Sequence, residues 1–468
     1  MRALLASLLA TAVAFPALAQ PLNPGQQRYH DLFKEMVETN TELSIGNCTT
    51  LAAKIQAHLK QAGFPDTDLH PFTGPDHPKE GGLVAVLPGS DPKAKPILLL
   101  GHIDVVEAKP EDWTRDPFKL IEENGYFYGR GVADMKSLAA IWIDTMERLK
   151  EEKFKHARTI KMALTCGEET ASAFNGAGYL AAHERDLIDA EFALNEGGGG
   201  HLDPSAKPLI MTVQAAEKFP QDYNLTVTNP GGHSSRPVPK NAINQLAAGL
   251  VKISQYQFPI EATDITRGYF AKMGPQVGGD MGAAMVAFAK DPADKAAAAK
   301  IATDPSYNGV LHTTCIATML GGGHATNALP QRATANINCR IFPGTTPEQV
   351  RAKLSELAGD PDIKVTFGAK RSEVPKGPQT LSPKVFGPVE KITAKYWPGI
   401  PVVPAMSAGA TDGAFLTPAG IPTYGVSGIF MDADGSGAHG LNEHVRMDSV
   451  YKGRDFLYDI VKVYSNEK

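Results

Sequence analysis

The stretch at residues 98–106, LLLGHIDVV, places the strongest constraint on how this chain folds. An unbroken aliphatic run is typical of a strand buried on both faces in a parallel sheet. The run ends at His102, and Asp104 follows two residues later. Side chains two residues apart share a face, so both can enter one pocket at the strand end, where open α/β sheets bind ligands. A carboxylate beside an imidazole orients the ring for metal binding, and the alternative is a strand-end histidine with a solubilising aspartate.

The hydrophobic pattern changes character near residue 211. Before it, strand patterns alternate with helical patterns, which predicts an α/β fold with a mostly parallel sheet flanked by helices. After it, strands alternate apolar and polar residues, which predicts a smaller α+β domain with antiparallel strands, inserted in the first. We expect residues 260–309 to be mostly helical and exposed, and 373–383 to return the chain to the first domain. The expected helices are 26–39, 50–62 (with Thr49 or Thr50 as N-cap), 137–149, 177–184, 241–255, 347–357, 383–397 and 447–463, and the expected strands are 81–87, 97–106, 159–165, 191–194, 223–228, 313–320, 333–342 and 423–426.

Residues 1–19 have the pattern of an export signal. Arg2 gives a positive start, residues 4–15 form an apolar core, and Ala17-Leu18-Ala19 fits a cleavage site before Gln20. The apolar run is short for a membrane span, and a retained anchor is the alternative. We therefore expect an exported protein, periplasmic or secreted, with no membrane attachment after cleavage.

Composition excludes some classes of partner. The 468-residue chain is long enough for two domains and carries a formal net charge of −5. Its charges are mixed, without the basic block typical of nucleic-acid binding. Four cysteines are too few for a disulfide framework. Cys315 and Cys339 lie in strand-like runs around a glycine-rich turn, where they either form a disulfide across a hairpin or remain two buried thiols.

Four further segments supply metal-type ligands where a predicted strand gives way to a loop. GRGVADMKS carries Asp134, TCGEET carries Glu168 and Glu169, FALNEGGGG carries Glu196, and GAHGLNE carries His439. Each has an ordinary alternative: a helix-capping aspartate, a solvated acidic turn or a surface histidine. Adjacent carboxylates at a strand end repel each other unless a cation or proton intervenes.

Taken together, these segments predict a two-metal site. Zinc takes nitrogen and oxygen ligands of this kind. One bridging carboxylate would give each of two ions three protein ligands, with the ions roughly 3.5–4 Å apart and a water between them. Glu168 is left beside a ligand, where a general base is needed. The predicted ligands are His102, Asp134, Glu169, Glu196 and His439.

The ordered motifs resemble those of one family. It is the dinuclear-zinc metallopeptidase family of glutamate carboxypeptidase, aminoacylase, carnosine-type dipeptidases, acetylornithine deacetylase and succinyl-diaminopimelate desuccinylase. The resemblance implies two Zn²⁺ per chain, with Co²⁺ or Mn²⁺ as alternatives. His102, Asp134 and Glu196 would hold one ion and Asp134, Glu169 and His439 the other, with Asp104 supporting His102 and Glu168 as catalytic acid/base. The motifs are GHIDVV, GRGVADMKS, CGEE, NEGGG, GGHSSRP, NALP, CRIFPG, GATDG and AHGLNE.

The same resemblance divides the chain into domains. After the signal peptide at 1–19, it implies a catalytic zinc domain at 20–211 and 376–468, and a lid and dimerisation domain at 212–375. In the lid, His233 would reach the substrate carbonyl in the partner's site of a homodimer. Asn327 and Arg340 would bind the substrate, Arg340 through its carboxylate, which a guanidinium can bond with two parallel N–H groups.

Three functions follow as hypotheses. The first is hydrolysis of a peptide or amide bond in a small substrate with a free carboxylate, of the carboxypeptidase or dipeptidase type. The second is an N-acyl-amino-acid amidohydrolase, which the same residues fit. The third is a non-catalytic binding protein that keeps the fold, which the complete ligand set with Glu168 disfavours.

Overall fold

The computed structural model describes residues 21–170, 174–368 and 381–467. The expected signal peptide at 1–19 and the predicted domain boundary at 375–376 lie outside these ranges. No helix within the described ranges combines the length and the apolar character that a membrane span requires.

A large sheet forms the centre of the first domain, and it contains ten strands among the described residues. Its middle strands β6, β3, β7 and β17 run parallel, which confirms the predicted mostly parallel α/β fold. Antiparallel pairs lie toward both ends of the sheet. In order the strands are β1 (Leu69–Gly74), β2 (His77–Leu87), β6 (Ile160–Thr165), β3 (Ile97–His102), β7 (Phe192–Asn195), β17 (Thr423–Gly425), β9 (Pro208–Glu217), β8 (Gly200–Leu202) and β18 (Phe430–Met431), with β16 (Val402–Ser407) paired to β9.

Helices cover both faces of this sheet, which explains the unbroken aliphatic run of β3. Leu99 joins the core on one face, whereas Leu98 and Leu100 join a separate core on the other. Side chains alternate along a strand, so a strand covered on both faces needs apolar residues at every position. The first core includes α1 (Pro24–Glu38), α2 (Cys48–Gln61), α3 (Lys136–Glu151), α12 (Pro383–Tyr396) and α14 (Met447–Tyr464), and the second includes α4 (Gly176–His183), α5 (Arg185–Ile188) and α13 (Gly413–Leu416).

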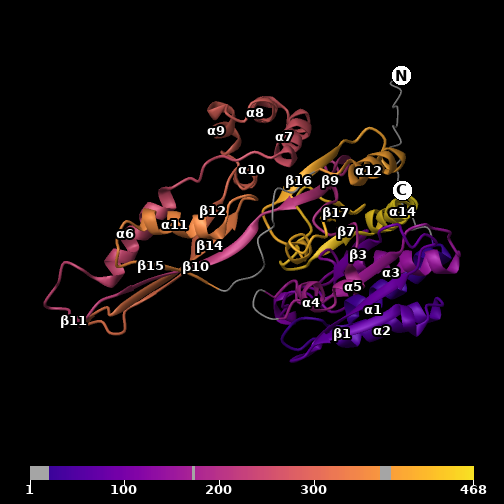
Figure 1. The fold of residues 1–468 in the computed structure, drawn as a ribbon, viewed down its shortest axis with the longest axis horizontal. Helices are drawn as coiled ribbons and strands as arrows, with labels where there is room; N and C mark the ends of the chain where they lie inside the picture. Colours follow the sequence, from indigo (N-terminus) through magenta and orange to yellow (C-terminus); the bar gives the residue numbers. More distant parts are fainter. Residues whose placement is uncertain (1–20, 171–173, 369–380, 468) are drawn as a thin grey trace, which may run out of the picture.

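A smaller antiparallel sheet projects from the large domain (Figure 1). Its strand order is β12 (Thr314–Gly322), β14 (Arg332–Ile341), β10 (Phe219–Thr228) and β15 (Lys364–Phe367). The helices α6 (Ala242–Gln255) and α11 (Pro347–Ala358) bury their apolar faces against it. A short pair, β11 (Gly232–His233) with β13 (Ala328–Leu329), lies at the end of this sheet farthest from the large domain (Figure 1).

The junction between the sheets differs from the predicted boundary at 211–212. Strand β9 continues in the large sheet to Glu217, and β10 of the small sheet begins at Phe219. Lys218 alone separates the two strands, and Glu217, Lys218 and Phe219 are all buried, so no turn or exposed loop marks the crossing. The segment 260–309 is helical as expected, but it packs on the large domain, with Phe270 against Ile210 and Val403 in one core. Its helices are α7 (Asp264–Val277), α8 (Gly279–Lys290), α9 (Lys295–Ile301) and α10 (Pro305–Asn308).

The remaining strands β4 (Ile121–Glu123), β5 (Tyr126–Tyr128) and β19 (His444–Arg446) form a separate sheet. All four cysteines are paired in disulfides. Cys315 and Cys339 are register partners across β12 and β14, so the disulfide alternative is the one observed. The second disulfide, Cys48–Cys166, was not predicted.

Candidate metal centre

The predicted ligands meet at the carboxyl edge of the parallel strands. His102 is the last residue of β3, Glu168 and Glu169 follow β6, and Glu196 follows β7. Parallel neighbours all deliver their carboxyl ends to the same edge, so three segments distant in sequence converge there. Asp134 precedes α3, and His439 lies in the loop before β19.

Asp134 lies between two groups of ligands. Its Oδ1 is 3.2 Å from His102 Nε2, and its Oδ2 is 3.1 Å from His439 Nε2. Glu196 Oε1 is 3.5 Å from the same nitrogen of His102, and Glu169 Oε2 is 2.9 Å from that of His439. Each carboxylate oxygen of Asp134 therefore faces a different imidazole, and each imidazole also lies beside one further carboxylate.

Asp104 orients His102 from the opposite side of the ring. The Nδ1 of His102 lies 3.1 Å from the Asp104 carbonyl oxygen and 3.6 Å from its carboxylate. Both side chains are buried, at 1% and 2% exposure. A proton held on Nδ1 leaves the lone pair of Nε2 directed at Asp134 and Glu196, as a metal ligand requires.

Electrostatics show how strongly this cluster needs positive charge. Hydrogen bonds with the carboxylates of Asp134, the larger contribution, and Glu169 raise the pKa of His439 to about 10. Burial raises the pKa of Glu196 to about 7. Burial opposes the imidazolium form of His102, but the Glu196 and Asp104 carboxylates outweigh it and hold the His102 pKa well above its usual value. Protons thus offset the carboxylate charges here, a role that divalent cations also perform.

Glu168 has a distinct environment. Its backbone N–H and that of Glu169 donate to the Asp104 carboxylate, at 3.4 and 3.0 Å. Burial, reinforced by the nearby Glu196 charge, raises the pKa of Glu168 well above its usual value. A carboxyl group with a raised pKa beside ligands is suited to accept and return a proton near neutrality.

The donor set fits divalent metal ions. Ligand atoms of His102, Asp134 and Glu169 all lie within 4.8 Å of one another, as do those of His102, Glu168 and Glu196. The second group contains Glu168 in place of Asp134, so distance alone does not separate ligand from acid/base. Imidazole nitrogen with carboxylate oxygen is a ligand set that zinc accepts.

Glu443 is a site residue that we did not predict, although the GAHGLNE motif contains it. Its carboxylate is fully buried and accepts the backbone N–H groups of Gly131, Ala133 and Asp134 at 2.8–3.0 Å. It also pairs with the Arg130 guanidinium at 2.8 Å. One side chain from the His439 loop therefore fixes the loop that carries Asp134.

Asp412, in the GATDG segment, anchors the loop of Glu168. It is 1% exposed and accepts hydrogen bonds from Thr165 Oγ1 at 2.6 Å and Asn175 Nδ2 at 2.8 Å. Thr165 and Asn175 lie on either side of that loop. The structure thus places Asp412 in a supporting position.

The predicted substrate residues occupy two separate places. His233 in β11 is exposed, and the neighbouring Ser234 N–H donates to the Asn327 carbonyl at 2.9 Å. Both lie at the far end of the small sheet, away from the metal ligands of their own chain (Figure 1). Arg340 lies at the opposite end, where it is the register partner of Pro220, just after the junction between the sheets.

An α/β sheet with imidazole and carboxylate donors gathered at the carboxyl edge of its strands is suited to a metal-dependent hydrolase. The pattern that describes the Peptidase family M20/M25/M40 matches residues 98–463. The chain belongs to this family, which confirms the resemblance inferred from the motifs and disfavours the non-catalytic alternative.

Relatives and solved structures agree with this assignment. The human "N-fatty-acyl-amino acid synthase/hydrolase PM20D1" is 25% identical over 433 residues, which cover 91% of this chain and 85% of that protein. The M20 family metallo-carboxypeptidase Sso-CP2 from Sulfolobus solfataricus has a similar fold, with a TM-score of 0.69 at 20% identity, covering 95% of this chain and 100% of that one. YXEP from Bacillus subtilis, described as a dinuclear metal binding peptidase, aligns with a TM-score of 0.57 at 14% identity, covering 94% and 98%.

The raised pKa of His439 makes metal binding release protons. Below about pH 10 the metal-free imidazole carries a proton that a cation must displace, so apparent metal affinity rises with pH. We expect zinc titration of metal-free protein, followed by calorimetry in buffers of different ionisation enthalpy, to show proton release even at about pH 8.5. An ordinary histidine would already be neutral there, so the absence of release at that pH would contradict the assigned geometry.

The buried pair of Glu443 and Arg130 is expected to stabilise the fold. Glu443→Gln leaves a guanidinium at 3% exposure without its counter-charge, which should lower the free energy of unfolding by about 3–5 kcal/mol. Chemical denaturation of metal-loaded protein measures the change. Glu123→Gln is the matched control, because Glu123 pairs with Arg115 at the surface and should change stability by less than about 1 kcal/mol. Equal effects of the two substitutions would argue against the supporting role of Glu443.

Proposed function

We propose that this chain binds two zinc ions and hydrolyses a peptide or amide bond in a small substrate with a free carboxylate. The observation that carries the proposal is the position of Asp134, whose two carboxylate oxygens face His102 and His439 separately. His102, Asp134 and Glu196 would hold one ion, and Asp134, Glu169 and His439 the other. The dinuclear peptidase YXEP supports two ions, since its fold is similar.

The residues of this chain have definable roles in such a reaction. Bound divalent cations would polarise the substrate carbonyl and lower the pKa of an attacking water. Glu168 accepts the proton of that water and then donates it to the leaving nitrogen. Asp104 keeps the His102 ring in the orientation that presents Nε2. Arg340 binds the free carboxylate of the substrate, and Asn327 and His233 contact it from a second subunit, where His233 stabilises the developing oxyanion.

An N-acyl amino acid is the second candidate substrate, and one cavity favours it. A cavity of about 270 Å³ reaches Asp134 and Glu196 and has Met135, Leu138 and Phe430 among its lining residues. An apolar acyl chain would be stabilised there by about 0.8 kcal/mol for each buried CH₂ group. Similarity to an N-fatty-acyl-amino acid synthase/hydrolase supports this candidate, whereas similarity in fold to a metallo-carboxypeptidase supports the first.

A panel of matched dipeptides and N-acyl amino acids, with and without chelator, tests the proposal and separates the candidates. Glu168→Gln should lower kcat by about 10²–10⁴-fold while two ions per chain remain, because only proton transfer is lost. Glu169→Gln is the comparison, and it should lose one ion. Metal content is measured by elemental analysis. Loss of metal from the Glu168 variant would make Glu168 a ligand instead.

We also propose a homodimer formed through the small domain. Strand β12 lies at the edge of the small sheet and exposes Ile316, Met319 and Leu320 at 68, 71 and 74%. Exposed apolar residues on an unpaired edge strand are suited to association with another chain. The position of His233, distant from the metal ligands of its own chain, supports a role in the partner's site.

Complementation between inactive variants tests the cross-subunit role. Homodimers of His233→Ala and Glu168→Gln should each be nearly inactive, yet their mixture should recover about a quarter of wild-type activity, because half the dimers are mixed and one of their two sites is complete. Activity after subunit exchange is the measurement. No recovery despite exchange would place His233 in its own chain's site.

Substitution of Met319 and Leu320 by Lys should yield monomers in light scattering. Val286→Lys on α8, 46% exposed in the wild type, is the control and should leave the dimer intact.

We propose that the protein is exported, to the periplasm or outside the cell. The support is the pairing of all four cysteines in disulfides, which persist in oxidising compartments. Sequencing of the mature N-terminus tests the expected cleavage before Gln20.

A further inference from the structure

The Cys48–Cys166 disulfide joins the active-site loop to a segment 118 residues earlier in the chain. Cys166 follows β6 directly and precedes Glu168 by two residues, and Cys48 is the first residue of α2. The Asn47 side chain caps that helix by accepting the Thr50 N–H at 2.9 Å, so the cap is neither Thr49 nor Thr50 as predicted. One end of the disulfide is thus anchored on a capped helix packed in the main core.

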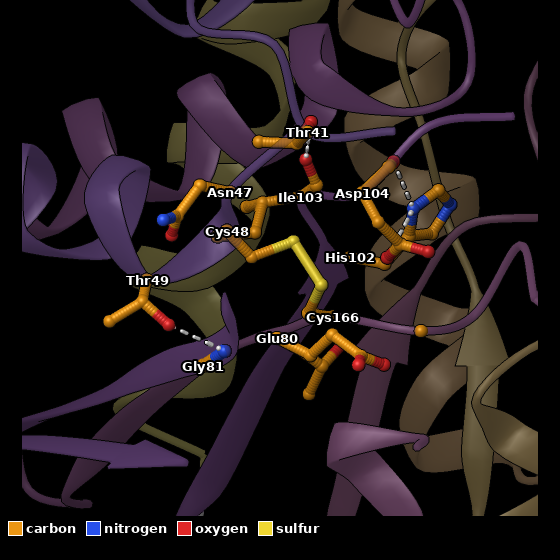
Figure 2. Close-up of a disulfide and its surroundings, with 12 residues drawn as sticks. Thr41, Asn47, Cys48, Thr49, Glu80, Gly81, His102, Ile103, Asp104 and Cys166 are labelled. Carbon is orange, nitrogen blue, oxygen red and sulfur yellow. Dashed lines mark hydrogen bonds and ion pairs between the residues drawn. A yellow bond between two sulfur atoms is a disulfide. The ribbon is translucent and has the colours of Figure 1, made fainter. Parts of the chain in front are cut away.

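The segment before Cys48 is itself tied to the metal centre. Thr41 Oγ1 donates to the carbonyl of Ile103 at 2.7 Å, and the Val105 N–H donates to the Thr41 carbonyl at 3.4 Å. Figure 2 shows the disulfide beside the strand end that carries His102 and Asp104. The segment 41–48 is therefore attached to the strand end that carries His102 and, through the Cys48 sulfur, to Cys166.

Hydrogen bonds hold the described part of the loop after Cys166, residues 166–170, and the Cys166 carbonyl itself accepts the Gly176 N–H at 2.8 Å. The N–H groups of Glu168 and Glu169 donate to Asp104, and the Gly167 carbonyl accepts from Asn175 Nδ2 at 3.3 Å. Gly167 has φ of +94°, and a Cβ there would come within 1.8 Å of the Phe174 carbonyl, so the turn has one tight geometry. Within the described residues, the Glu168 carboxylate accepts no hydrogen bond, and its direction follows from the loop backbone.

We propose that the Cys48–Cys166 disulfide is a positioning element that fixes the backbone of the Glu168 loop against the metal centre. The inference rests on the proposed function and assigns to this cross-link a role in turnover. Without the disulfide, a cation bound to Glu169 would still hold that residue in place. Glu168 has no such anchor and would lose its alignment with the attacking water. A displacement of about 1 Å in a positioned group lowers rates by up to about a hundredfold.

Reduction of the disulfide is the direct test. A phosphine reductant is used because dithiols also bind zinc; phosphorus is oxidised to the phosphine oxide, the S–S bond takes up two electrons, and one water supplies the oxygen and the two thiol protons. Both cysteines are buried, at 2% and 4% exposure, so complete reduction is verified by thiol counting before kcat is measured. We expect kcat to fall about 10–100-fold, with KM and metal content unchanged, and to recover on reoxidation.

Paired variants separate this disulfide from the other. Cys48→Ala with Cys166→Ala should reproduce the loss of kcat. Cys315→Ala with Cys339→Ala is the matched control and should keep kcat, because the β12–β14 ladder holds those residues in register without the bond. Circular dichroism and metal analysis confirm that each variant is folded and loaded.

Hydrogen exchange gives a readout that does not depend on activity. We expect the amides of residues 166–170 to exchange at least about tenfold faster in the reduced protein, while those of β3 are unchanged. Unchanged exchange and kcat, or a loss of kcat that follows loss of metal, would overturn the positioning role. An oxidised, metal-loaded protein inactive on the whole substrate panel would instead overturn the proposed function, and the role in turnover with it.

Discussion

The carboxylate of Asp104 is the interaction on which the rest of the site depends. It lies beside His102 Nδ1 and accepts the backbone N–H groups of Glu168 and Glu169. One buried acid therefore sets the direction of an imidazole at the end of β3 and the position of a loop at the end of β6. These strands are hydrogen-bonded neighbours in parallel register, so the distances between their ends are fixed by the sheet itself.

The parallel sheet also explains why so much of this arrangement could be predicted from the sequence. The aliphatic run before His102 identifies a strand covered on both faces, and the acids at 168–169 and 196 follow strands of the same kind. Because parallel strands end at one edge, residues distant in sequence can be assigned to one pocket without knowledge of strand order. The ordered motifs then identified the family, whose pattern matches residues 98–463.

Other features depend on contacts that no local pattern records. Glu443 accepts three N–H groups from a loop about 310 residues away, and Cys48 pairs with Cys166 across 118 residues. The chain crosses between the two sheets at the single residue Lys218, and α7 packs on β16 of the large domain although it follows β10, β11 and α6 in the chain. Periodicity reports which face of an element is buried, but it does not report which partner buries it.

The distribution of functional groups separates metal binding from substrate binding. All five candidate ligands and Glu168 come from the edge of one sheet and its adjoining loops, where buried contacts from Asp104, Asp412 and Glu443 hold them. The groups assigned to the substrate lie on the projecting domain, with Arg340 near the junction and His233 at the distal end. If the proposed roles hold, the metal centre would be complete within one chain, whereas the substrate site would become complete only when a second copy brings His233 to the metal centre. The buried supporting contacts are thus concentrated around the metal ligands, where ions need fixed geometry. The small domain, which carries the groups assigned to the substrate, is connected to the large domain at Lys218, between β9 and β10.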